Sequence, residues 1–397
     1  MDYSFSDRIS SLQPSAIREI LKNTADPNII PFAAGNPSPE AFPVKEIENI
    51  IGILMGDNPI ACLQYSISEG YPALREACAN FANSREPGLV HEGDSTLIIS
   101  GAQQGIEMTA KCLINEGDTI LCEDPSFIGA LNALRSFNPN LVGIPMERDG
   151  INVDKLEEAI KANSNVKMLY LIPNFQNPTG VTMSLEKRKA VYQLAKKYGI
   201  IILEDNPYGD LRFSGEHIPA IKTLDTEGLV VYVGSFSKII SPGMRVGYVI
   251  ANSAIMAKLV VAKQCSDVHT AILNQMICER FLASCNMNAH LANLQRIYKA
   301  KSNLLLKSLE EAVGDKLTWN QPEGGLFVWC TLPDGVDMPA FCGAAAQAGV
   351  AVVPGSAFLV KLGAPCQSFR VNFSTPTNKQ LTDGAEILGR VLHDFVR

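Results

Sequence analysis

The sequence lacks the features that mark several classes of protein. Its 397 residues contain no apolar run long enough to cross a bilayer, and the first residues lack the apolar core of a signal peptide. Basic residues are not in excess, since 34 lysines and arginines stand against 41 acidic residues, and a net charge of −7 argues against a nucleic-acid-binding surface. We therefore expect a cytoplasmic protein that binds neither membranes nor nucleic acid.

Cysteine and histidine patterns of known function are also missing. The ten cysteines form no CxxC pair, and no two of the five histidines have the spacing of metal ligands. Cysteines scattered through a chain of this length are typical of reduced, small apolar residues. The sequence therefore predicts no metal site.

The chain does contain enough apolar sequence for a large core. Hydrophobic residues make up 46% and charged residues 19% of the chain, which suits a compact fold. Short apolar runs alternate with segments of helical periodicity, and this indicates an α/β fold with a mostly parallel, seven-stranded sheet flanked by helices. The apolar runs lie at 96–100, 119–122, 141–145, 166–172, 200–204, 229–233 and 246–250.

The rhythm of the sequence changes near residue 288, where a long helical segment begins. Shorter strand-like pieces and two helices follow it, which indicates a smaller α+β domain. At the other end, a helical pattern at 9–22 precedes a loop at 31–43 that is long enough to lie over a site. We expect three parts: an N-terminal segment (1–45) that packs with the small domain, a large domain (46–287) and a small domain (288–397).

Lys238 stands between polar residues, just after an apolar run. Ser235-Phe236-Ser237-Lys238 follows the run 229–233, and Arg245 comes seven residues after the lysine. One interpretation is a solvated lysine in a surface loop, although the apolar neighbours make this less usual. The other is an amine that forms a Schiff base, with Ser235, Ser237 and Arg245 binding a phosphate. An aldehyde and a phosphate are the two groups of pyridoxal 5'-phosphate that a protein must hold, so we predict this cofactor.

Three more segments follow strand-like runs, so they can lie with Lys238 at one site beyond the carboxyl ends of the strands. Ser100-Gly101-Ala102-Gln103 is either a plain connection or an anion site at a helix start. Asn177, before Pro178, either caps a rigid turn or donates to an anionic oxygen. Asp205 either caps the next helix or pairs with a protonated pyridine nitrogen, and Tyr208 three residues later can reach a phenolate oxygen.

The order of these segments resembles the fold-type-I, pyridoxal-phosphate-dependent aminotransferases of class I/II. Within that family, the sequence is similar to the 2-aminoadipate, kynurenine and broad-specificity transaminases. The resemblance covers nearly the whole chain and implies the fold of the PLP-dependent transferases. The motifs that carry it are Phe32–Pro37, Leu63–Ser66, Gly101–Gln103, Asn177–Gly180, Asp205 with Tyr208, Ser235–Lys238 with Arg245, and Phe369–Phe373.

The resemblance implies a role for each residue around the cofactor. Lys238 would bond the aldehyde and later move a substrate proton, while Asp205 would pair with the ring nitrogen. Asn177 and Tyr208 would contact the phenolate oxygen, and Phe127 would stack on the ring. The phosphate would be held by Gly101, Ala102, Gln103, Ser235, Ser237 and Arg245, and by Tyr65 reaching across from a second subunit of a homodimer with shared sites. Relatives often carry a hydroxyl residue where this chain has Ala102, so one contact is absent here.

The resemblance also implies a substrate site. Arg370 would grip an α-carboxylate with two hydrogen bonds, assisted by Asn177 and Gly35. Arg18 either meets a second carboxylate or is a solvated helix residue. The predicted function is ping-pong transfer of an amino group from an aromatic, aliphatic or aminoadipate-like L-amino acid to a 2-oxo acid such as 2-oxoglutarate. The alternatives are a β-lyase or decarboxylase on the same fold, and a non-enzymatic ligand sensor, which the acidic charge disfavours.

Overall fold

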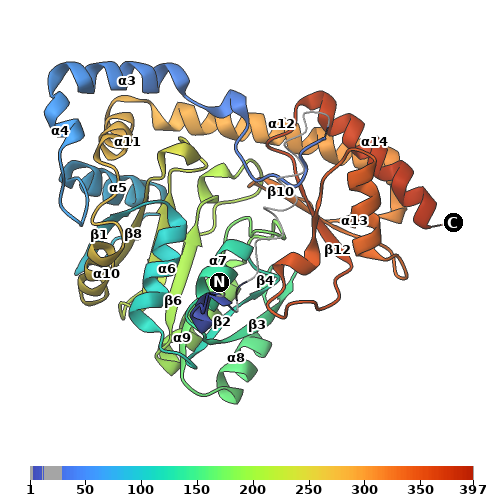
Figure 1. Ribbon diagram of the computed structural model, residues 1–397, viewed down its shortest axis with the longest axis horizontal. Helices are drawn as coiled ribbons and strands as arrows, with labels where there is room; N and C mark the ends of the chain where they lie inside the picture. The colour runs from blue at the N-terminus through green and yellow to red at the C-terminus, as the bar shows by residue number, and fades with distance from the viewer. Residues whose placement is uncertain (1–2, 11, 13–28, 397) are drawn as a thin grey trace.

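A computed structural model describes residues 3–10, 12 and 29–396 of the chain. Figure 1 places the C-terminal helices and strands on one side of the molecule and the large sheet on the other. The long helix α12 (Met287–Val313) extends along the top of this view from one part to the other. The helical pattern expected at 9–22 is described only in part. Helix α1 covers Asp7–Ser10, and residues 11 and 13–28 lie outside the described part of the chain.

The other elements have the following bounds. The strands are β1 (Asp94–Ile99), β2 (Thr119–Asp124), β3 (Asn140–Glu147), β4 (Gly150–Ile151), β5 (Val166–Leu171), β6 (Ile201–Asn206), β7 (Val230–Ser235), β8 (Gly247–Asn252), β9 (Thr318–Trp319), β10 (Phe327–Thr331), β11 (Val353–Pro354) and β12 (Ser368–Asn372). The α-helices are α3 (Val44–Asp57), α4 (Pro59–Leu63), α5 (Pro72–Arg85), α6 (Ala102–Leu113), α7 (Ile128–Arg135), α8 (Val153–Ala162), α9 (Leu185–Tyr198), α10 (Ser253–Ser266), α11 (Ile272–Ser284), α13 (Met338–Gln347) and α14 (Asn378–Phe395). Short 3₁₀ helices are η1 (Pro39–Ala41), η2 (Gly209–Leu211), η3 (Ile221–Leu224), η4 (Pro242–Met244), η5 (Gly314–Lys316) and η6 (Gly355–Phe358).

The large sheet confirms the mostly parallel α/β fold. Its strand order is β1-β8-β7-β6-β5-β2-β3-β4. The pairs from β7 through β6, β5 and β2 to β3 are parallel, whereas β8 and β4 add antiparallel pairs. All seven expected strands are present. The sheet has an eighth, β4, because two residues after a turn pair with the end of β3, and such a short strand has no apolar run to predict it.

Both faces of the large sheet are buried, as strands that are apolar throughout predict. Successive residues of one strand point to opposite faces. In β2, Ile120 and Cys122 belong to one apolar core, whereas Leu121 belongs to another, together with residues of α8 and α9 such as Leu156 and Val191. The sheet is therefore a central layer between two helical layers.

A second, antiparallel sheet lies in the C-terminal part of the chain. Its order is β11-β12-β10-β9, and Phe327 to Thr331 of β10 pair with Asn372 to Ser368 of β12. Helix α14 begins with a capping box between Thr377 and Gln380 and packs beside α12. This arrangement is the α+β pattern expected after residue 288, and it brings β12 toward the carboxyl ends of the large sheet.

The lengths and compositions of the helices bear on whether the chain could span a membrane. Among residues 3–10, 12 and 29–396, none is both long and apolar enough to cross a bilayer.

Candidate active site

A cavity of about 320 Å³ opens at the carboxyl ends of the parallel strands. Asp205 lies near the end of β6, Ser235 ends β7, and Ala102 begins the helix that follows β1. Parallel strands end at one edge of a sheet, so segments far apart in sequence meet there. The predicted site residues that line the cavity are Gly35, Ala102, Gln103, Phe127, Asn177, Asp205, Tyr208, Ser235, Ser237, Lys238, Arg245 and Arg370.

Lys238 is partly buried in this cavity and its amine points to the N-terminal segment. Its Nζ donates a hydrogen bond to the carbonyl oxygen of Gly35 at 2.9 Å. Burial, together with the positive charges of Arg370 and Arg245, lowers the pKa of this amine to about 8. About a tenth of Lys238 is therefore neutral at pH 7, and a neutral amine is a nucleophile and a base.

Asp205 presents an unsatisfied carboxylate oxygen in the same cavity. Its side chain is 2% exposed, and its Oδ2 accepts a hydrogen bond from the Tyr170 hydroxyl at 2.9 Å. Its Oδ1 has no hydrogen-bond partner among the described residues. Burial raises the pKa of Asp205 to about 7, and the Tyr170 bond opposes this rise. A cationic nitrogen bound at this carboxylate would keep it ionised.

Arg370, on β12, is a buried cation that also lines this cavity. Its Nη1 donates to Asn177 Oδ1 at 2.8 Å, and its Nη2 donates to the carbonyl oxygens of Ala33 (2.9 Å) and Ala34 (3.2 Å). Burial lowers the pKa of the guanidinium to about 10, so it keeps its charge at neutral pH. No carboxylate in the part of the chain that the structure describes pairs with Arg370. This arrangement suits a carboxylate supplied by a ligand.

The start of helix α6 and Arg245 form an anion cradle. Gly101 precedes the helix with φ of +82° and no side-chain cap, so the N–H groups at Ala102 and after it can meet an anion. The positive φ of Gly101 disfavours any residue with a side chain, and a Cβ there would also come within 2.2 Å of Arg245 Nη2. The hydroxyls of Ser235 and Ser237 line the cavity beside them, and Ser235 Oγ accepts a hydrogen bond from Ser237 N at 3.2 Å.

Two predicted residues are not part of the cavity lining. Gly101 lies behind it, where its missing side chain makes room for Arg245. Tyr65 is 84% exposed and stands apart from the cavity, so its predicted contact with the cofactor of a second subunit stays a prediction. Arg18 lies outside the described residues, and its predicted contact with a second substrate carboxylate also remains a prediction.

The structure adds three aromatic residues that the sequence analysis missed. Tyr170 donates the hydrogen bond to Asp205. The rings of Phe327 and Phe358 both contact the Arg370 guanidinium, with their centres 4.2 and 5.1 Å from its Cζ. In sequence, these residues look like ordinary core positions of a strand or turn. Only their contacts across the fold mark them as part of the site.

The groups in the cavity fit pyridoxal phosphate. The unpartnered Oδ1 of Asp205 is available to a ring nitrogen, and the cradle at Gly101 and Arg245 is available to a phosphate. Lys238, whose amine has a lowered pKa, lines the same cavity and is available to an aldehyde. A cavity of about 320 Å³ falls within the range of small-molecule sites.

Comparisons with known proteins support a pyridoxal phosphate site. A model of the family "aminotransferase class I and II" matches residues 27–388. The chain is 38% identical to an aromatic-amino-acid aminotransferase of Thermococcus litoralis, covering 100% of this chain and 96% of the relative.

Two solved structures at 34% identity are also similar, and each alignment covers 99% of this chain and 98% of the other. One is the kynurenine aminotransferase of Pyrococcus horikoshii in complex with PMP, with a TM-score of 0.94. The other is an alpha-aminoadipate aminotransferase of Thermus thermophilus complexed with N-(5'-phosphopyridoxyl)-L-leucine, with a TM-score of 0.90. The chain therefore belongs to the class I and II aminotransferases and is an enzyme that uses pyridoxal 5'-phosphate.

Proposed function

We propose that the enzyme transfers the amino group of an aromatic, aliphatic or aminoadipate-like L-amino acid to a 2-oxo acid, with 2-oxoglutarate as the acceptor. The observation that carries this proposal is Arg370, a buried cation in the Lys238 cavity that has no carboxylate partner among the described residues. Amino acids and 2-oxo acids share a carboxylate beside the reacting carbon, so one arginine can bind both. The names of the relatives support the aromatic and aminoadipate-like classes.

Different residues of the cavity would bind different parts of the cofactor. Asp205 would bind the ring nitrogen, Asn177 and Tyr208 the phenolate oxygen, and Phe127 one ring face. Ser235, Ser237 and Arg245, with the N–H groups at Ala102 and Gln103, would hold the phosphate. Bound pyridoxal phosphate supplies an aldehyde that bonds amines and a ring that withdraws electrons from the substrate Cα.

Lys238 and Arg370 would act on the substrate. Arg370 fixes the carboxylate and thereby orients the bond between Cα and its hydrogen. The pKa of Lys238 Nζ is about 8, so part of this amine is neutral and can accept that proton. The amine later returns the proton to the carbon that receives the amino group. Because the two substrates use the same carboxylate site in turn, we propose ping-pong kinetics.

The lowered pKa of Lys238 leads to a pH prediction for loading of the cofactor. The reactive form is the neutral amine, which is populated above the folded-state pKa of about 8. The rate at which apoprotein captures pyridoxal phosphate should therefore rise by roughly tenfold per pH unit below about pH 7.5 and level off above about pH 8.5. Stopped-flow absorbance measures this rate. Binding of 4'-deoxypyridoxine phosphate, which lacks the aldehyde, is the control and should not show this rise. A flat capture rate with pyridoxal phosphate would contradict the assignment.

A panel of amino donors tests the reaction itself. Holoenzyme, 2-oxoglutarate and a single L-amino acid should yield glutamate, with phenylalanine, kynurenine, leucine and 2-aminoadipate as the first donors. Initial rates at several fixed donor concentrations should give parallel double-reciprocal lines. Formation of pyruvate and ammonia from cysteine or serine conjugates without an acceptor would instead favour a β-lyase. Release of carbon dioxide would favour a decarboxylase.

We also propose a homodimer whose interface includes α3, α4 and the loop to Tyr65. Large apolar side chains are exposed on these neighbouring elements, among them Ile53 (43%), Ile60 (69%), Leu63 (70%) and Tyr65 (84%). Exposed apolar residues concentrated in one region are typical of an interaction surface. Two-fold dimers are the common solution for such a surface. Light scattering should give twice the chain mass, and a fully active monomer would contradict the proposal.

A further inference from the structure

Arg188 is a fully buried arginine on α9 that holds both ends of the loop 173–183. Its Nη2 donates to the Pro173 carbonyl oxygen at 3.0 Å and to Asn174 Oδ1 at 2.7 Å, where the loop begins. Its Nε donates to the Met183 carbonyl oxygen at 3.0 Å, where the loop ends. The exposed fraction of Arg188 is 0%. A backbone hydrogen bond from Met183 N to the Pro173 carbonyl oxygen (2.8 Å) joins the two ends of this loop, and the planar guanidinium reinforces that closure from the side chain of Arg188.

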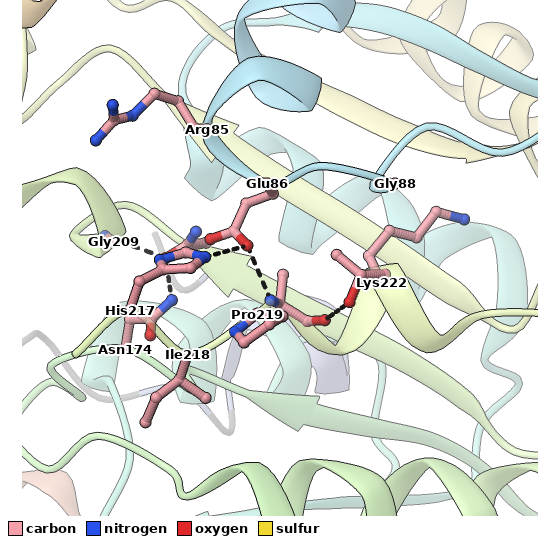
Figure 2. Close-up of polar contacts among 12 residues, drawn as sticks. Arg85, Glu86, Gly88, Asn174, Gly209, His217, Ile218, Pro219 and Lys222 are labelled. Atoms are coloured by element: carbon pink, nitrogen blue, oxygen red, sulfur yellow. Dashed lines mark hydrogen bonds and ion pairs between the residues drawn. The ribbon is translucent and has the colours of Figure 1, made fainter.

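The same guanidinium is fixed from a second side. Its Nη1 donates to the carbonyl oxygens of Ile218 (3.2 Å) and Pro219 (3.0 Å). Figure 2 shows this segment with Asn174 nearby and Glu86 above it, and Glu86 Oε2 accepts a hydrogen bond from the next residue, Ala220, at 3.1 Å. All five N–H bonds of Arg188 thus have acceptors, and the 218–220 segment that supplies two of them is itself anchored.

The charge of Arg188 is compensated within the same buried region. Burial lowers its pKa to about 10, and the carboxyls of Glu204 and Glu86 act against this decrease. Glu204 accepts hydrogen bonds from the backbone of Ile221 (2.9 Å) and Lys222 (2.7 Å), just beyond the segment that Arg188 holds. The guanidinium therefore stays charged at neutral pH, and its geometry is set by neighbours that are themselves hydrogen-bonded.

The loop 173–183 is hydrogen-bonded to two parts of the candidate site, namely Arg370 and the end of β6 that carries Asp205. Asn177, in the loop, accepts the hydrogen bond from Arg370 Nη1 at 2.8 Å. Asn174, at the start of the loop, donates to Asn206 Oδ1 at 3.0 Å, and Asn206 follows Asp205 in β6. A shift at the base of the loop would therefore move the partner of Arg370 and loosen the strand end that carries Asp205.

We propose that Arg188 is a positioning residue for substrate binding. By closing the base of loop 173–183, it holds Asn177 where Asn177 orients Arg370 for the substrate carboxylate. This inference rests on the proposed function of Arg370 as the carboxylate-binding residue. Lysine at position 188 would keep the charge but could not bridge the two loop ends and the 218–219 carbonyls with a planar fork.

The test compares binding of an unreactive carboxylate to holoenzyme variants. We expect Arg188→Lys to raise the Kd of 3-phenylpropionate, measured by calorimetry, by about 10-fold to 100-fold, because small misplacements of a binding group have effects of this order. The KM of the amino donor should rise in parallel, with a much smaller change in kcat and with the cofactor retained. Asn174→Ala removes only one Arg188 contact and the link to Asn206, so it should raise the Kd by a smaller factor. This variant provides the test if Arg188→Lys does not fold.

Tyr192→Phe is the matched control for general destabilisation. Tyr192 is buried on the same helix as Arg188, and its hydroxyl bonds with Asp225 and Thr226, away from the loop. This variant should melt at a lower temperature but bind 3-phenylpropionate as the wild type does. An Arg188→Lys or Asn174→Ala holoenzyme with unchanged Kd and KM would overturn the inference. Arg370→Ala is measured in the same series. If Arg370→Ala loses 3-phenylpropionate binding while the Arg188 variants keep the wild-type Kd, the inference about Arg188 fails but the proposed function of Arg370 stands.

Discussion

Lys238→Ala is expected to lower the rate of amino transfer by at least about 10³-fold, because the variant lacks the group that we propose moves the substrate proton. The residues proposed to hold the phosphate and the ring of the cofactor do not include Lys238. The variant should therefore still bind pyridoxal phosphate, but without the absorption band of a lysine-bound cofactor. Rapid mixing of the loaded variant with phenylalanine measures the half reaction directly.

A second variant, Lys238→Met, separates the role of the Lys238 amine from a general effect on the cavity. Lys238→Met retains most of the side-chain volume, so it should lose the half reaction to the same extent as Lys238→Ala while keeping a similar melting temperature. Near-normal turnover in either variant would mean that another base moves the proton, and would contradict the role given to Lys238.

Arg370→Lys is expected to raise the KM of the amino acid by about 10²-fold. A charge-assisted hydrogen bond contributes about 1.5–3 kcal/mol, and every 1.4 kcal/mol is a factor of ten, so losing one of two prongs gives an effect of this size. Lysine keeps the positive charge, which separates the loss of the two-pronged geometry from the loss of charge. Steady-state kinetics with phenylalanine and 2-oxoglutarate measure the change.

Phenylethylamine provides the control for Arg370→Lys, because it is phenylalanine without the carboxylate. Its half reaction does not use a carboxylate site, so the wild type and the variant should handle it at the same rate. An equal loss with phenylethylamine would show that the substitution damages the cavity in general. An unchanged KM for phenylalanine would show that the carboxylate binds elsewhere.

The sequence predicted the architecture of the large sheet because each strand is an apolar run between turns or helices. The seven runs correspond to β1, β2, β3, β5, β6, β7 and β8. It could not predict β4, whose two residues form a strand only because β3 lies beside them. The division into domains at residues 45 and 287 stays a prediction, although the second sheet does begin after α12.

The sequence predicted most of the site because polar residues at strand ends are rare enough to stand out. Lys238 and Asp205 stand out in this way, whereas Arg370 was implied by the resemblance to the aminotransferases, and all three line one cavity. Tyr170 and Phe327 were missed because aromatic residues in strands are normally core residues. Arg188 was missed because a basic residue near a helix start is usually solvated. Its burial depends on carbonyl groups from two distant segments.

Chemical trapping of the cofactor tests the central claim most directly, namely that this cavity binds pyridoxal phosphate through Lys238. Reduction of the holoenzyme with borohydride fixes the bond between the cofactor and its lysine, and mass spectrometry of a digest then locates the modified residue. We expect one phosphopyridoxyl group per chain, on the peptide that contains Lys238. Modification of a different lysine, or no modification of a loaded enzyme, would contradict it.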